Sequence, residues 1–198
     1  MDWSKRTLEY YDRNHETFIS GTVDANMKDT RSRFAACLPT GGTILDFGCG
    51  SGRDTKAFLN MGFSVEATDG SEELCALASD YTGICVRCEL FEELDACGKY
   101  DGIWACASIL HLPREELADV LRKIFTALKP GGVLYTSFKY GDFEGMRNGR
   151  YFTCFTEKSL AVFWENVKGL QIFDRWITED VRPDRKDEKW INLLARKV

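Results

Sequence analysis

The chain has 198 residues, of which 44% are hydrophobic and 29% are charged, and its formal net charge at pH 7 is −5. This composition is typical of a globular protein, and the length predicts a single domain, residues 1–198. The acidic balance argues against nucleic acid as a partner, because a long polyanion favours a basic surface. Residues 1–6 lack the apolar core of a signal peptide, and no apolar run approaches the roughly 20 residues that cross a bilayer. We therefore expect a cytoplasmic protein with no membrane partner.

Eight cysteines raise the question of disulfides or metal binding. In a chain without a signal peptide, we expect reduced thiols that serve as small apolar residues. The one CxxC pair is Cys85 and Cys88, and no second pair of Cys or His residues stands at metal-binding spacing. The sequence therefore predicts no metal site.

The first elements are predicted from apolar spacing and from capping residues. Leu8, Tyr11 and Phe18 share one face of a first helix, for which Ser4 is the candidate N-cap. In chain order, we then expect helices at 28–38, 55–61 and 72–80, and strands at 43–47, 64–68 and 84–88. Ser71 is expected to cap the helix at 72–80.

The second half of the chain contains the clearest helix signal. Leu117, Leu121 and Ile124 recur at helical spacing between 113 and 128, and Lys-Pro-Gly-Gly at 129–132 ends that helix. We also expect strands at 102–106, 133–138, 170–177 and 190–197, a polar loop at 139–152, and a helix at 156–168.

Alternating strands and helices predict an α/β fold with a mainly parallel sheet and helices on both faces. Such sheets bind ligands at the carboxyl ends of their strands. This rule brings residues 48–52, Asp69, residues 90–91 and residues 106–111 to one edge of the sheet. The candidate site is therefore at this edge.

The segment 44–54, "ILDFGCGSGRD", is a strand followed by a glycine loop and the start of a helix. Its glycines follow G-x-G-x-G, whereas a dinucleotide-binding loop has G-x-G-x-x-G. Asp46 would repel a pyrophosphate but suits a cationic ligand, and S-adenosylmethionine carries an ammonium and a sulfonium and no phosphate. Asp69, at the end of the second strand, can accept both ribose hydroxyls in either ligand class. These acids favour S-adenosylmethionine over NAD.

Four motifs between 42 and 138 together resemble the class I S-adenosylmethionine-dependent methyltransferases. They are "ILDFGCGSGRD", "VEATDGS", "YDGIWACASILHLP" and "LKPGGVLYTSF". The resemblance implies a Rossmann-like sheet of seven mostly parallel strands, with the last strand antiparallel. The opening "YYDRNHETF" and the form "GSGRD" also resemble the tellurite-resistance-related small bacterial methyltransferases.

The resemblance also implies which residues bind the cofactor. They are Gly48, Cys49 and Gly50 at the methionine part, Asp69 with Gly70 and Ser71 at the ribose, Leu90 and Phe91 at the adenine, and the backbone of Cys106 at the methionine end. Family members often carry an aspartate in the third motif, where this chain has only glutamates, in "CELFEEL". The adenine contacts are thus where the sequence departs from the family pattern.

For several candidate site residues, two interpretations remain open. Arg53 either contacts the carboxylate of the cofactor or pairs with Asp54 or solvent. His111 follows the fourth strand at the mouth of the site, where it is either a catalytic, substrate-facing residue or a structural one. The candidates for the acceptor pocket, against the alternative of an ordinary solvated loop, are Tyr140, Arg150, Tyr151 and Arg182. Attack on a sulfonium mainly requires alignment, so a general base is not always needed.

The N-terminal segment 1–40 is predicted to be a helical cap or lid. Tyr11 and its aromatic neighbours suit the covering of an adenosine and a sulfonium, since a cation is attracted to an aromatic face. The alternative is a helix that simply packs on the sheet.

The expected function is transfer of a methyl group from S-adenosylmethionine to a small-molecule acceptor. The fourth strand ends in "ACASIL" and lacks the Asn/Asp-Pro-Pro-aromatic signature that holds a planar exocyclic amine in this fold. The alternatives are an RNA or protein methyltransferase of the same fold, and a protein that binds S-adenosylmethionine or S-adenosylhomocysteine without catalysis. An NAD-dependent dehydrogenase is disfavoured by Asp46.

Overall fold

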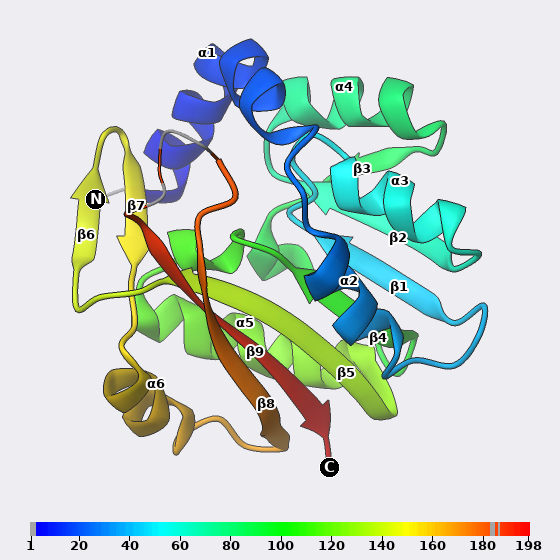
Figure 1. Cartoon of the computed structure of the whole chain (residues 1–198), viewed down its shortest axis with the longest axis vertical. Coiled ribbons are helices and arrows are strands. Elements are labelled where there is room, and N and C mark those ends of the chain that lie inside the picture. The colour runs from blue at the N-terminus through cyan, green and yellow to red at the C-terminus, as the bar shows by residue number, and fades with distance from the viewer. Residues whose placement is uncertain (1–2, 183–184, 186) are drawn as a thin grey trace.

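The computed structural model describes residues 3–182, 185 and 187–198. Its central sheet has seven strands in the order β3-β2-β1-β4-β5-β9-β8 (Figure 1). These are β1 (Thr43–Phe47), β2 (Ser64–Asp69), β3 (Val86–Cys88), β4 (Tyr100–Ala105), β5 (Leu128–Lys139), β8 (Leu170–Glu179) and β9 (Lys189–Lys197). Strand β9 runs antiparallel to both β5 and β8, and the pairs among β1 to β5 are parallel. The predicted fold class, including the antiparallel last strand, is confirmed.

The helices flank this sheet as the alternation of elements predicts. They are α1 (Trp3–Thr22), α2 (Lys28–Ala35), α3 (Arg53–Asn60), α4 (Glu72–Thr82), α5 (Arg114–Ala127) and α6 (Glu157–Trp164), with short 3-10 turns η1 (Phe91–Glu93) and η2 (Ile109–His111). Ser71 caps α4, as predicted, because its hydroxyl accepts the backbone N–H of Leu74 at 3.2 Å. The N-cap prediction for Ser4 is wrong, since α1 already includes Trp3.

Alternate residues of the strands build two apolar layers. Leu45 and Ile103 pack in one buried cluster with Leu121 of α5, while their strand neighbours Ile44 and Trp104 pack in a second cluster with α2 and α3. Successive side chains of a strand point to opposite faces of the sheet, so the helices on each face cover one of these layers. Near-continuous burial of β1 and β4 follows from this two-sided covering.

The predicted polar loop at 139–152 is wrong, because a hairpin forms there. Strands β6 (Glu144–Arg147) and β7 (Arg150–Thr153) pair antiparallel, and Asn148 and Gly149 turn between them. Both turn residues have positive φ, 50° and 80°, as a type I′ hairpin turn requires. Asn-Gly is a strong signal for such a turn, but the polar sequence around it concealed the strands.

Helix α1 lies across the edge of the sheet where the parallel strands end. Figure 1 shows it between α4 and the β6–β7 hairpin, and it contacts both α4 and β7. Within the described residues, no helix is both long enough and apolar enough to span a bilayer. The same residues hold no group of three or more His, Cys, Asp or Glu side chains arranged as metal ligands, and Cys85 and Cys88 are both exposed.

Candidate functional site

A cleft opens at the carboxyl ends of β1, β2, β4 and β5, beneath α1. It brings together most of the residues that the sequence singles out: Tyr11, Asp46, Gly48, Cys49, Gly50, Arg53, Asp69, Gly70, Leu90, Phe91, Cys106, His111, Arg150 and Arg182. Three predicted site residues do not line it: Ser71, Tyr140 and Tyr151.

The glycine loop after β1 forms one wall of the cleft. Gly48, Gly50 and Gly52 all have positive φ, and the backbone N–H groups of Gly48 and Cys49 both donate to the carbonyl of Thr68 at 2.9 Å. A Cβ atom on Gly48 would lie 2.5 Å from the Cβ atom of Ser108, which is too close for any side chain. Glycine is therefore required where the loop packs against Ser108, and Gly48, Cys49 and Gly50 of this loop line the cleft.

Asp69 joins the end of β2 to this loop. Its carboxylate accepts the backbone N–H of Gly50 at 2.8 Å and that of Ser71 at 3.0 Å. Burial raises the pKa of Asp69 above its ordinary value, against the effect of these hydrogen bonds. The hydroxyl of Ser71 instead donates to Asp12 of α1 at 2.6 Å and caps α4, which explains why Ser71 does not line the cleft.

Asp46 is a buried acid, 2% exposed, at the floor of the cleft. Burial, followed by the charge of Asp54, raises the pKa of Asp46 to about 7. Its carboxylate accepts a hydrogen bond from the hydroxyl of Thr55 at 2.6 Å. A cation placed in the cleft would favour its ionised form, whereas a phosphate would oppose it.

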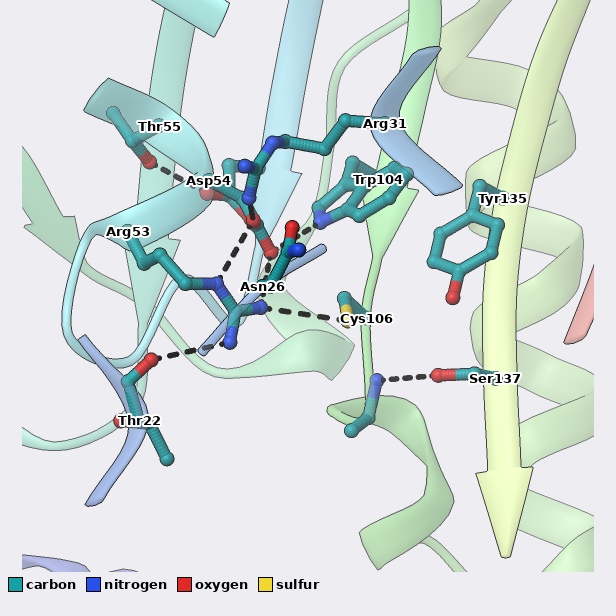
Figure 2. Close-up of polar contacts among 12 residues, drawn as sticks. Thr22, Asn26, Arg31, Arg53, Asp54, Thr55, Trp104, Cys106, Tyr135 and Ser137 are labelled. Atoms are coloured by element: carbon teal, nitrogen blue, oxygen red, sulfur yellow. Dashed lines mark hydrogen bonds and ion pairs between the residues drawn. The ribbon is translucent and has the colours of Figure 1, made fainter. Parts of the chain in front are cut away.

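Arg53 pairs with Asp54 in this structure, one of its two predicted alternatives (Figure 2). Its Nε and Nη2 atoms donate to the two oxygens of Asp54 at 3.0 and 2.6 Å, and Nη1 donates to the carbonyl of Thr22 at 3.3 Å. Asp54 also accepts from Nη1 of Arg31 at 2.6 Å and from the indole N–H of Trp104 at 3.0 Å. Arg53 still lines the cleft, and its contact with a cofactor carboxylate stays a prediction.

Asp54 is therefore the hub of a buried network that sequence reasoning missed. Figure 2 shows Arg31 of α2, Arg53 of α3 and Trp104 of β4 converging on its carboxylate, and Arg53 links this network to the Thr22 carbonyl at the end of α1. The signal in the sequence is its place directly after Arg53 in "GSGRD". Its partners from other elements could not be read from the sequence.

The turn after β4 supplies Cys106 and Ala107. Burial raises the pKa of the Cys106 thiol to about 12, so the thiol stays protonated near neutral pH. Ala107 has a φ of 52°, an unusual value for a residue other than glycine, and its N–H donates to the hydroxyl of Ser137 at 2.9 Å (Figure 2). This sharp turn exposes the backbone after β4 to the cleft.

Leu90 and Phe91 line the other end of the cleft, beside Glu89. The ring of Phe91 lies 4.8 Å from that of Phe47, and a Cβ atom on Gly70 would lie 2.8 Å from a methyl group of Leu8 in α1. Leu90 and Phe91 thus give this end apolar walls that suit a flat aromatic group, beside the acids Glu89 and Glu92.

His111 and Tyr11 link η2 to α1. The Nδ1 atom of His111 lies 2.6 Å from the carbonyl oxygen of Tyr151, and its Nε2 atom lies 2.8 Å from the hydroxyl of Tyr11. A carbonyl only accepts, so Nδ1 carries the proton and Nε2 accepts from Tyr11. Burial lowers the pKa of His111 to about 4 and raises that of Tyr11. In this geometry His111 is neutral and positions Tyr11.

Strand alternation explains why two acceptor candidates face away from the cleft. Arg150 and Phe152 of β7 line it, so Tyr151 between them points to the other face, where its ring packs 5.3 Å from Trp3 and its hydroxyl contacts Glu144 at 3.3 Å. Tyr140 is 38% exposed and follows Lys139, which lines the cleft. The acceptor assignments of Tyr140 and Tyr151 are therefore not supported.

Comparisons with known proteins agree with this arrangement. A family model described as "Methyltransferase domain" matches residues 19–166. Ubiquinone biosynthesis O-methyltransferase from Bradyrhizobium is 30% identical over 106 residues, 51% of this chain and 41% of that protein. The 2-methyl-6-phytyl-1,4-hydroquinone methyltransferase of Synechocystis is 27% identical over 188 residues, 85% of this chain and 54% of that protein. The chain thus spans about half the length of the curated relatives it matches.

The fold also matches a solved structure over its full length. This is 1,6-didemethyltoxoflavin-N1-methyltransferase of Burkholderia thailandensis, with bound 1,6-didemethyltoxoflavin and S-adenosylhomocysteine. The TM-score is 0.83 at 24% identity, and the match covers 100% of this chain and 89% of that one. At this identity, the likeness establishes the fold.

Proposed function

Because the chain belongs to the methyltransferase domain family, we propose that it transfers the methyl group of S-adenosylmethionine to a small-molecule acceptor. The observation that carries the proposal is one continuous cleft. It joins the glycine loop and Asp69 on one side to His111 and Arg150 on the other. Such a cleft can hold a cofactor and a small acceptor side by side.

The residues of the cleft fit this cofactor. Asp69 lines the cleft, where its carboxylate can accept ribose hydroxyls, and the loop backbone at Gly48 can contact the methionine part. Asp46, with a pKa of about 7, gains its charge beside a cation and would lose it beside a pyrophosphate. When bound, S-adenosylmethionine supplies a methyl group on a sulfonium. The chain's part is to align the acceptor with that methyl group.

Helix α1 covers the cleft, and this cover favours a small methyl acceptor. Helix α1 is fastened by polar contacts that include those from Tyr11 to His111, from Ser71 to Asp12, from the Tyr151 backbone to Thr7, and from Arg53 to the Thr22 carbonyl. An RNA or a protein chain would have to displace this helix to reach the cleft. The names of the quinone-pathway and toxoflavin methyltransferases also support a small acceptor. The narrower relation to tellurite-resistance-related methyltransferases rests on "YYDRNHETF" and "GSGRD" alone.

Helix α1 and the residues up to 40 form a lid in this proposal. S-adenosylhomocysteine is expected to slow tryptic cleavage after Lys5, Arg6, Arg13 and Lys28, because the ligand adds contacts beneath the helix. Tyr11→Phe should reduce this protection, since it removes the hydroxyl that donates to His111. The matched control is Tyr10→Phe, which removes a neighbouring hydroxyl and retains the ring. Cleavage rates, read by mass spectrometry, that are equal with and without ligand would refute the lid.

The function itself is tested by supplying methyl-labelled S-adenosylmethionine and separating the products by class. Label is expected on a small molecule. Label on RNA or protein would favour the alternative methyltransferase classes, and cofactor binding without any transfer would favour a non-catalytic binding protein.

A further inference from the structure

Arg150 is a cation at the end of the cleft that also contains His111, across from the glycine loop and Asp69. We call this end the acceptor end. Its guanidinium carbon lies 4.3 Å from the ring centroid of Tyr10 and 5.1 Å from that of Phe152. Its Nη1 atom donates a long hydrogen bond, 3.5 Å, to the hydroxyl of Tyr11, and its buried Nε atom has no hydrogen-bond partner. A buried donor without a partner is costly, so the site is incomplete as it stands.

Neighbouring cations at this end differ from Arg150 because carboxylates neutralise them. Lys139 pairs with Glu188, and Arg182 pairs with Asp180 at 2.5 Å. Among the described residues, Arg150 forms no ion pair with a carboxylate. Its charge is therefore available to a ligand in the cleft.

The groups that face this end offer no strong proton acceptor. His111 has a pKa lowered to about 4 by burial, and both of its ring nitrogens are engaged. Burial raises the pKa of Tyr11, which acts as a donor. Asp180 accepts from Arg182 and from the Trp190 indole, and these partners hold its pKa below the ordinary value despite burial.

Two other titratable groups, from the adjoining strands, also line the cleft, as does the cation Arg185. Lys139 of β5 is a paired cation, and Glu179 at the end of β8 is exposed to solvent at the rim. The protein therefore favours a methyl acceptor that is already deprotonated when it binds.

We propose that the methyl acceptor is a small conjugated organic anion, such as a carboxylate, an enolate or a phenolate conjugated with a carbonyl, and that Arg150 binds its charge. This inference rests on the proposed function. One oxygen of the anion pairs with Arg150, and another atom of the same conjugated system provides the lone pair. That lone pair forms a bond to the methyl carbon while the carbon–sulfur bond breaks, and the electrons of the broken bond stay on sulfur. No proton moves.

The step also removes the charge that binds the acceptor. An anion and a sulfonium become a neutral methylated product and a neutral thioether, so Arg150 loses its counter-ion when the product forms. Charge-assisted pairing thus holds the acceptor and not the product. The loss of this charge pair therefore also favours release of the product.

The test uses two probes of equal shape, benzoate and benzamide, titrated by calorimetry into protein saturated with S-adenosylhomocysteine. Benzoate is expected to bind at least about tenfold more tightly than benzamide, as a charge-assisted pair would give. Arg150→Gln should reduce benzoate affinity to the benzamide level and leave S-adenosylhomocysteine affinity unchanged. Arg147→Gln is the matched control, because Arg147 lies on β6 of the same hairpin, exposed and stacked on Phe143.

Arg150→Lys is a second variant that keeps the charge, so a preference for benzoate should survive even if the glutamine variant fails to fold. Equal binding of the two probes, no benzoate binding, or benzoate binding that survives in a folded Arg150→Gln protein would overturn the inference. Failure of S-adenosylhomocysteine to bind the unaltered protein would instead overturn the proposed function. The two failures are thus distinguishable.

Discussion

Replacement of Asp54 by alanine is expected to lower the free energy of unfolding by about 3–5 kcal/mol, because it leaves two buried guanidinium groups without a counter-ion. The side chains of Arg31 and Arg53 are 15% and 17% exposed, and that of Asp54 is 6% exposed. The indole N–H of Trp104 also loses its acceptor. Urea denaturation followed by circular dichroism measures the change.

The matched control is Asp119→Ala on α5. Asp119 also pairs with an arginine, Arg122, but their side chains are 61% and 72% exposed. Exposed pairs contribute about 0–1 kcal/mol, so this variant should be nearly as stable as the unaltered protein. A loss of less than about 1 kcal/mol in Asp54→Ala would show that the network is not a structural hub.

The Asp54 network also has a pH signature. Burial alone would raise the pKa of Asp54, but Arg53 and Arg31 hold it below the ordinary value. A depressed pKa means that the stabilisation is complete above the unfolded-state pKa of about 4 and is lost as the pH falls through the folded-state value. The difference in stability between the unaltered protein and Asp54→Ala should therefore shrink at acid pH.

Asp69→Ala should weaken S-adenosylhomocysteine binding by about 150- to 25,000-fold. Two hydrogen bonds from ribose hydroxyls to a charged acceptor are lost, each of about 1.5–3 kcal/mol. The structure adds a second reason, because Asp69 also accepts the N–H groups of Gly50 and Ser71 and so holds the glycine loop. Titration calorimetry measures the affinity.

Glu66→Ala is the matched control for Asp69→Ala. Glu66 lies on the same strand, but it pairs with Arg87 and Lys99 and does not line the cleft. Its removal should leave S-adenosylhomocysteine affinity unchanged. An affinity that is also unchanged in Asp69→Ala would show that Asp69 only holds the turn. Binding of NAD in place of S-adenosylhomocysteine would contradict the cofactor assignment.

The parts of the fold that sequence reasoning predicted correctly depend on local patterns. The helical spacing in 113–128 and the strand–glycine loop–helix unit at 44–54 are read from neighbouring residues, and both are confirmed as α5 and as β1 with α3. The β6–β7 hairpin was missed because both strands have only four residues and β6 contains two charged residues and a glycine. Its orientation then decided that Arg150 faces the cleft and Tyr151 does not.

The missed parts of the site depend on contacts between distant segments. Asp54 meets Trp104, and Asp12 of α1 meets Ser71, across 50 and 59 residues of sequence. His111 illustrates the same limit, because its role follows from the Tyr11 hydroxyl and the Tyr151 carbonyl that surround it. The sequence predicts a histidine at the mouth of the site, but only its packed neighbours show which ring nitrogen carries the proton.

The most direct test of the proposed function follows the methyl group. The protein is incubated with methyl-labelled S-adenosylmethionine and, separately, with a low-molecular-mass metabolite fraction, bulk RNA and bulk protein; Asp69→Ala serves as the negative control. We predict label in a product of the metabolite fraction that depends on Asp69. Label in RNA or protein, or no label in any fraction from a protein that binds S-adenosylhomocysteine, would contradict the proposal of a small-molecule methyltransferase.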